Sequence, residues 1–108
     1  HDEIYAAVSH LPHILAYSLV NLVNNINPDY IEHAGQGFKD ATRIAMSSPE
    51  LWRDISLYNR VNIIRLLEQF RREISKLEGM LHSSEASHLE AEFARAQALR
   101  KRIEQLRT

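Results

Sequence analysis

The sequence predicts an all-α domain, and three observations support this fold class. Apolar residues recur at steps of three and four along most of the 108 residues, which is the spacing of one helical face. No segment of any length shows the alternating apolar and polar pattern of a β-strand. Turn and helix-start signals, such as Asn27-Pro28-Asp29 and Ser48-Pro49, separate the periodic segments. At this length we expect one domain with a modest core.

The composition is that of a globular protein, with 44% hydrophobic and 25% charged residues. Thirteen basic and 14 acidic residues give a net charge of -1, so the chain offers no bulk attraction to nucleic acid or to an anionic membrane. The absence of cysteine excludes disulfides, thiolate metal sites and a cysteine nucleophile. It is also typical of a reducing compartment, and we expect a cytoplasmic protein.

The first predicted helix covers residues 1 to about 25, and Pro12 should kink or restart it because proline lacks a backbone N–H. We expect the apolar run from 11 to 26 to be too short and too polar to span a bilayer. The chain starts at His1, without methionine and already inside this helix, so we expect it to be part of a longer protein. One wide apolar face should be buried, formed by Leu11, Ile14, Leu15, Leu19, Leu22, Val23 and Ile26.

Two histidines, His10 and His13, lie three residues apart on this helix and therefore project from one side of it. They can be hydrogen-bonded, partly buried rings at the kink, or they can recognise an anion or a hydroxyl group, for which histidine is suited. Metal binding would require a third ligand, and no H-E-x-x-H arrangement is present, so we expect no metal site.

The middle of the chain places two glycines and an arginine close together. Gly35-Gln36-Gly37 predicts a loop whose backbone needs unusual dihedral angles or a close approach to another group, after a short helical turn over 30 to 34. A short helix over 38 to 46 follows and carries Arg43, whose planar guanidinium is the natural partner of a carboxylate. The alternative for Arg43 is a surface ion pair with Asp40 or Glu50.

Three further helices complete the prediction. Ser48 is the expected N-cap of the next helix, and Pro49 is its first residue. This helix carries Trp52, the only tryptophan of the chain, which we expect to anchor the core. A long helix runs from about 59 to 82, and a last one from 85 to 107. Together these two carry more apolar surface than so small a domain can cover, which indicates contact with a partner or a second copy.

Three segments, in this order and spacing, resemble the C-terminal region of the prephenate dehydrogenase family, which includes the arogenate and cyclohexadienyl dehydrogenases. The resemblance covers about residues 1 to 80. The segments are Ser9-His10-Leu11-Pro12-His13, then Gly35-x-Gly37-Phe38-Lys39-Asp40-x-Thr42-Arg43-Ile44-Ala45, and Ser48-Pro49-x-x-Trp52-x-Asp54-Ile55.

The resemblance implies a helical domain like the C-terminal domain of 6-phosphogluconate dehydrogenase, with long helices in an intertwined homodimer. Residues 1–82 would be its core and 83–108 its C-terminal helix. The family converts prephenate to 4-hydroxyphenylpyruvate by NAD(P)-dependent oxidative decarboxylation in tyrosine biosynthesis. No G-x-G-x-x-G occurs in this chain, so the Rossmann domain that binds NAD or NADP is absent, and with it the catalytic histidine. We therefore expect no catalytic residue and no bound cofactor here, and an inactive fragment.

The resemblance also assigns roles to individual residues. His13 would bind substrate and Arg43 would pair with a prephenate carboxylate, with Gln36 and Gly37 of the loop beside them. Many members have glycine where Gln36 stands, which leaves the role of that position open. The residues expected to support or gate the site are Asp2, His10 and Trp52. Prephenate or arogenate is the expected ligand, with no nucleic acid or membrane partner; the competing reading is a non-enzymatic helical interaction domain.

Overall fold

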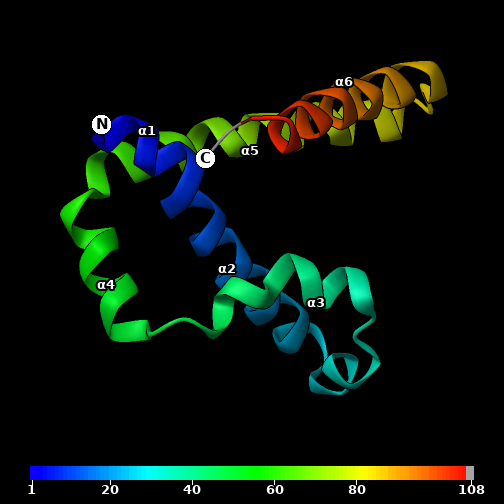
Figure 1. Ribbon diagram of the computed structural model, residues 1–108. Coiled ribbons are helices and arrows are strands. Elements are labelled where there is room, and N and C mark those ends of the chain that lie inside the picture. The colour runs from blue at the N-terminus through cyan, green and yellow to red at the C-terminus, as the bar shows by residue number, and fades with distance from the viewer. Residues whose placement is uncertain (107–108) are drawn as a thin grey trace. The chain divides into compact units, whose positions relative to one another are not determined.

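The computed structural model describes residues 1–106 and confirms the all-α prediction, because no strand occurs among these residues (Figure 1). The chain divides into two compact units, His1–Glu68 and a second that starts at Gln69. The division predicted at residue 82 lies at the end of a helix and differs from the boundary between these two units. That residues 1–82 form the core of the family's domain and 83–108 its C-terminal helix stays a prediction.

The first unit begins with α1 (Asp2–Tyr5), a π-helical turn η1 (Ala6–His10) and α2 (Leu11–Ile26). The Leu11 N–H donates to the carbonyl of Ala6, five residues back, which defines the π turn. Pro12 follows at the start of α2, where its missing N–H and its ring cannot continue a regular helical ladder. The predicted helical restart at Pro12 is confirmed.

The continuous helical stretch Asp2–Ile26 has 25 residues and a mean hydropathy of 1.3 over its most apolar window, enough by length and composition to cross a membrane. The expectation that the run is too short concerned residues 11 to 26 alone, whereas the π turn joins α1 to α2 and lengthens the apolar helix. Core helices of soluble proteins and signal sequences have the same properties, so this is weak evidence for a membrane span.

The predicted glycine loop is wrong at two of its three positions. After η2 (Pro28–His33), α3 (Gln36–Thr42) includes Gln36 and Gly37 in its first turn. Gly35 has φ -87° and ψ -177°, which is extended backbone open to any residue, and a Cβ at Gly35 or Gly37 would meet no atom within 4 Å. Neither dihedral angles nor a close approach within this chain therefore requires these glycines.

The predicted helix over 38 to 46 is interrupted. α3 ends at Thr42 (φ -114°, ψ 5°), and the 3₁₀ turn η3 (Arg43–Met46) continues from it. The Thr42 hydroxyl donates to the Phe38 carbonyl at 2.6 Å, a bond back along the helix that competes with the backbone ladder. Both α3 and η3 lie against α2 (Figure 1).

The predicted helix start at Ser48 is confirmed. α4 (Pro49–Tyr58) begins with the Ser48 hydroxyl accepting a hydrogen bond from the Leu51 N–H at 3.2 Å. The Tyr17 hydroxyl of α2 donates to the Ser47 carbonyl at 2.8 Å, which fixes the segment that leads into α4. α5 (Arg60–His82) follows, and its first residues belong to the first unit.

The second unit is a helical hairpin formed by the rest of α5 and by α6 (Ala86–Glu104). Ser84, with φ 53°, occupies the left-handed region in the turn between them. Lys76 of α5 lies 3.3 Å from the Glu92 carboxylate of α6 and ties the two helices together. The predicted helix end at Arg107 lies outside the described residues.

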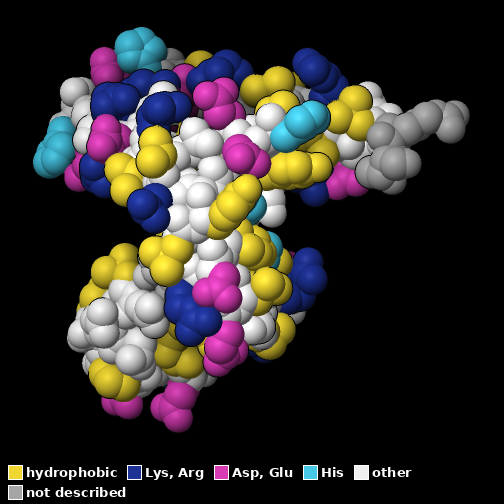
Figure 2. All heavy atoms as spheres, turned by 90° about the vertical axis from the view of Figure 1, so that its left-hand side faces the viewer, with side chains coloured by type: hydrophobic (Ala, Val, Ile, Leu, Met, Phe, Trp, Pro, Cys, Tyr) yellow, Lys and Arg dark blue, Asp and Glu magenta, His cyan; other side chains and the backbone are white. Residues whose placement is uncertain are grey.

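Little of the apolar surface is buried within this chain. Among the described residues, the buried hydrophobic side chains are Ala6, Ala16 and Ile63. The prediction of a buried face along α2 is wrong for its C-terminal part, because Leu22 is 56% exposed and Ile26 62% exposed. Figure 2 shows other hydrophobic side chains open at the surface as well. The predicted surplus of apolar surface is confirmed.

Candidate functional site

The two histidines meet the tryptophan. The His13 ring of α2 stacks on the Trp52 ring of α4, with centroids 3.6 Å apart and planes 14° apart. The His10 ring meets the same indole edge-on, at 5.9 Å and 75°. Trp52 is half-buried and contacts both imidazoles. The predicted projection of both histidines to one side of the helix therefore produces a three-ring cluster.

One ring nitrogen of His13 is already engaged. Its Nδ1 lies 3.1 Å from the Ser9 carbonyl, which can only accept, so Nδ1 carries the proton and donates. Among the described residues, Nε2 of His13 has no hydrogen-bond partner. A neutral His13 therefore presents a lone pair at Nε2, whereas a protonated His13 presents an N–H and a positive charge.

Asn59 lies at the junction of α4 and α5 and was not predicted as a site residue. It is 5% exposed, and its side-chain nitrogen lies 2.8 Å from the Asp2 carbonyl and 3.2 Å from Nδ1 of His10. Its side-chain oxygen accepts from Asn62 at 2.8 Å. The sequence signal that could have found it is a polar residue of low helix propensity between two strongly periodic helices.

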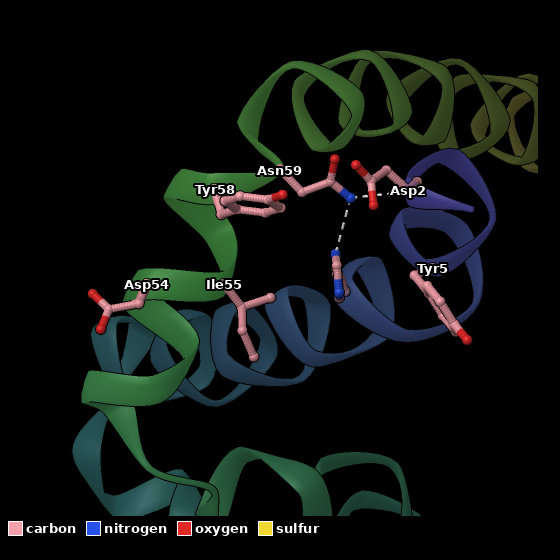
Figure 3. Close-up of a pocket in the computed structure, with 7 residues that line it drawn as sticks. Asp2, Tyr5, Asp54, Ile55, Tyr58 and Asn59 are labelled. Atoms are coloured by element: carbon pink, nitrogen blue, oxygen red, sulfur yellow. Dashed lines mark hydrogen bonds between the residues drawn. The ribbon is translucent and has the colours of Figure 1, made fainter.

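A cavity of about 490 Å³ adjoins this network. In Figure 3, Asp2 and Asn59 lie near one another, while Asp54 lies at the other side of the view and carries its carboxylate outward. A hydrogen bond from Arg53, 2.9 Å away, lowers the pKa of the Asp54 carboxyl. Among the described residues, no lysine or arginine lines this cavity, so these residues cannot by themselves neutralise a dianionic ligand. The lining residues are Asp2, Tyr5, His10, Asp54, Ile55, Tyr58 and Asn59.

Arg43 belongs to a different cavity of the same unit, of about 370 Å³, which is also lined by Gln36, Lys39 and Asp40. Gln36 donates from Nε2 to the Asp40 carboxylate at 2.8 Å. In the part of the chain that the structure describes, Arg43 forms no ion pair, so the alternative of a surface pair with Asp40 or Glu50 is not found.

The structure thus divides the predicted site residues into two groups. His10, His13 and Trp52 form one cluster, to which Asn59 connects the backbone of Asp2. Arg43 and Gln36 form the other group, with Gly37 in the adjoining first turn of α3. Asp2 and Arg43 form no ion pair between the described residues, and the supporting or gating role expected of Asp2 stays a prediction.

Neither a metal site nor a dinucleotide site is formed by the residues described here. Residues 1–106 contain no group of three His, Cys, Asp or Glu side chains that could hold a metal ion. A dinucleotide pyrophosphate is bound where a strand meets a glycine-rich helix start, and this helical chain has no G-x-G-x-x-G. Its residues therefore do not fit NAD or NADP without a further domain.

Comparisons with known proteins agree with the three motifs. The family model for "Prephenate dehydrogenase, dimerization domain" matches residues 1–95. The chain belongs to the prephenate dehydrogenase family. It is 39% identical over 103 residues to a prephenate dehydrogenase of Bacillus subtilis (strain 168), covering 93% of this chain and 28% of that protein. It is 34% identical over 104 residues to a cyclohexadienyl dehydrogenase of Zymomonas mobilis, covering 93% of this chain and 36% of that protein.

A solved structure gives the same family and fold. Prephenate dehydrogenase from A. aeolicus, crystallised with hydroxyphenyl propionate and NAD+, matches with a TM-score of 0.90 at 35% identity, over 95% of this chain and 37% of that one. The predicted helical C-terminal domain of this family is therefore confirmed. The chain spans about a third of the length of these relatives.

Proposed function

We propose that this chain is the substrate-binding and dimerisation part of an NAD(P)-dependent dehydrogenase that converts prephenate to 4-hydroxyphenylpyruvate. Family membership supports the reaction class. The observation that carries the site is the His13–Trp52 stack, because it holds His13 rigidly while leaving Nε2 free for a ligand. Arogenate is the alternative substrate, since one relative is a cyclohexadienyl dehydrogenase.

The residues of this chain would bind and orient the substrate. Prephenate carries two carboxylates on a compact ring; Arg43 offers a bidentate fork to one of them, and Nε2 of His13 is the ring nitrogen left for the ligand. Trp52 would line the mouth of the substrate pocket. Gln36 and Gly37, at the start of α3, would lie at the edge of that pocket. Loss of CO2 restores an aromatic ring, so accurate positioning accounts for much of the catalysis. NAD or NADP, held by the other domain, would accept the hydride.

We propose that surfaces beyond one copy of this unit complete the site, since His13 lies against Trp52 while Arg43 lines a separate cavity with Gln36 and Lys39. A second copy and the dinucleotide-binding domain are the two sources of such surfaces. Residues 1–82 would form the core of the domain and 83–108 its last helix, within a cytoplasmic homodimer that binds neither nucleic acid nor membrane. The exposed apolar side chains of α2, α5 and α6 support association through this domain.

Steady-state kinetics of the full-length protein test this function. We expect the protein to turn over prephenate. The values of kcat/KM are then compared between prephenate and arogenate as substrates, and between NAD and NADP as cofactors. Turnover of arogenate alone would select the alternative substrate. A protein with intact fold and bound dinucleotide that turns over neither compound would overturn the assignment and favour a non-enzymatic interaction domain.

The chain on its own should be an inactive dimer. It lacks a dinucleotide site, and its exposed apolar helices should bury well over roughly 1,000 Å² in total on association. Light scattering of residues 1–108 at micromolar concentration measures the mass directly. A sharp monomer mass, or dehydrogenase turnover by this chain alone, would contradict the proposal.

A further inference from the structure

Every hydrogen-bonding atom of the Asn59 side chain has a partner. The side-chain nitrogen donates hydrogen bonds to the Asp2 carbonyl and to Nδ1 of His10, and the side-chain oxygen accepts one from Asn62. The partners in α1 and η1 are 57 and 49 residues away in sequence, and Asn59 is 5% exposed. A buried, fully satisfied amide of this kind holds its neighbours in one arrangement.

The Asp2 carbonyl determines which way this amide points. A carbonyl oxygen only accepts, so the atom 2.8 Å from it must be the NH2 group of Asn59. The second hydrogen of that NH2 group then points to Nδ1 of His10, 3.2 Å away. Two donors cannot face each other across a hydrogen bond, so Nδ1 of neutral His10 is unprotonated. The ring proton of His10 therefore resides on Nε2.

We propose that Asn59 is a positioning residue of the substrate site, which fixes His10 as the Nε2–H tautomer so that His10 donates a hydrogen bond to a substrate oxygen. The inference rests on the proposed function. Nε2 of His10 has no partner among residues 1–106, and His10 lines the 490 Å³ cavity beside the Trp52 cluster. The donor is thus available where a ligand has room.

The two histidines are held in opposite tautomers by different partners. The Ser9 carbonyl keeps the proton of His13 on Nδ1, and Asn59 keeps the proton of His10 on Nε2. When both rings are neutral, the pair presents one donor and one acceptor next to the same indole. This arrangement recognises a group that both accepts and donates hydrogen bonds, such as a hydroxyl.

Nitrogen-15 NMR of the full-length protein with labelled histidine tests the tautomer directly, because a protonated and an unprotonated ring nitrogen differ widely in chemical shift. We expect His10 to show unprotonated Nδ1 and protonated Nε2. Asn59→Asp replaces the NH2 group by a carboxylate oxygen, which only accepts, so the proton should move to Nδ1. The control Asn62→Ala removes a neighbouring hydrogen bond but leaves the Asn59–His10 contact, and it should leave the tautomer unchanged. A protonated Nδ1 in the parent protein would overturn the proposal.

Two substitutions of His10 separate donation to substrate from a structural role. His10→Gln places an amide near the position of Nε2, whereas His10→Asn places one near Nδ1. If Nε2–H donates to substrate, His10→Asn should lower kcat/KM by roughly 2- to 12-fold and His10→Gln should retain more activity. The reverse order would show that only the contact with Asn59 matters, and it would overturn the proposal. These variants decide the question even if Asn59→Asp fails to fold.

The two experiments fail independently. If the parent protein turns over neither prephenate nor arogenate, the proposed function fails, yet the NMR spectrum still reports whether Asn59 sets the tautomer. If the parent protein is active but His10 carries its proton on Nδ1, the function stands and the role assigned to Asn59 is wrong. Thermal midpoints of all variants show whether a loss of activity reflects unfolding.

Discussion

The two units of this chain are stabilised in different ways. In the first unit, residues distant in sequence are joined by specific contacts, such as Tyr17 to Ser47 and Asn59 to His10. In the second, α6 and the end of α5 share few polar contacts, and large apolar side chains remain exposed, including Leu81 at 64% and Phe93 at 59%. The first unit is thus organised by its own side chains, while the second exposes large apolar side chains. We infer that the first unit positions ligand groups and that the second provides association.

This comparison predicts that substitutions in the first unit change substrate binding, whereas substitutions in the second change assembly. Arg43 should give the largest effect. In the full-length enzyme, Arg43→Ala should lower kcat/KM for prephenate by roughly 30-fold to several-thousand-fold, because a desolvated charge pair contributes on the order of 2–5 kcal/mol. Arg43→Lys should be impaired less, since it keeps the charge but loses the fork. Steady-state kinetics with dinucleotide affinity measured alongside provide the test.

The matched control for Arg43 is Arg65→Ala, which removes the same charge from an exposed pair with Glu3 at 3.7 Å. An exposed pair contributes at most about 1 kcal/mol, and only to stability. If Arg43→Ala and Arg65→Ala both stay within about twofold of the parent in kcat/KM, Arg43 is a surface residue and the site assignment fails.

Formation of the dimer should depend on the exposed apolar side chains of α6. Phe93 and Ile103 are 59% and 56% exposed in the isolated chain, so charges there would be buried on association. Phe93→Asp combined with Ile103→Asp should weaken the dimer by about 4 kcal/mol, or roughly a thousandfold in Kd, if both are interface anchors. Sedimentation of the full-length protein measures this. Gln97→Asp, at an exposed polar position of the same helix, is the control, and an unchanged dimer in the double variant would exclude Phe93 and Ile103 from the interface.

His13 should have the next largest effect. His13→Asn keeps a donor close to Nδ1, which preserves the contact with the Ser9 carbonyl, but removes Nε2. We expect kcat/KM to fall about 10- to 100-fold, as for the loss of a hydrogen bond to a charged group, with the fold intact. An unchanged kcat/KM together with a much lower thermal midpoint would instead identify His13 as a purely structural histidine.

Local signals in the sequence predicted local structure well. Ser48-Pro49 marks the start of α4, and Pro12 marks the irregular turn before α2, because capping and the missing N–H act within one turn. The family motifs identified His13, Trp52 and Arg43 as site candidates. Their separation into a His13–Trp52 stack and a cavity lined by Arg43 could not be predicted, since it depends on how α3 and α4 lie against α2.

Other features depend on distant contacts that no local pattern records. Asn59 acquires its role from partners 57 and 49 residues away, and no spacing in the sequence indicates them. Periodicity along α2 predicted an apolar face but could not say what covers it, and Leu22 and Ile26 remain exposed here. The glycines at 35 and 37 were expected to serve unusual backbone angles, which the helical start at Gln36 does not require.

Within the first unit, the Tyr17–Ser47 hydrogen bond should make a moderate contribution to stability. Tyr17→Phe leaves the Ser47 carbonyl without this donor and should destabilise the fold by about 0.5–1.5 kcal/mol. Chemical unfolding of the full-length protein measures the change. Tyr30→Phe, at a position 51% exposed with no side-chain hydrogen bond among the described residues, is the matched control. Equal stability of the two variants would show that the tie between α2 and the start of α4 contributes nothing.

The smallest effect should come from the ion pair within the hairpin, and it should depend on pH. A hydrogen bond from Lys76 lowers the pKa of Glu92, with Arg95 adding to the effect, and Glu92 in turn raises the pKa of Lys76. The stabilisation is therefore present at neutral pH, is lost as the pH falls through the lowered pKa of Glu92, and is lost again as the pH rises through the raised pKa of Lys76. Glu92→Gln should slightly lower the thermal midpoint of the hairpin at about pH 7 and have no effect at an acidic pH below the lowered pKa of Glu92, where the parent carboxylate is protonated. Glu90→Gln, at an exposed position of α6 with no ion pair in residues 1–106, should change neither value. If Glu92→Gln lowers the midpoint equally at both pH values, the effect comes from packing, and the second unit is held by more than its exposed charges.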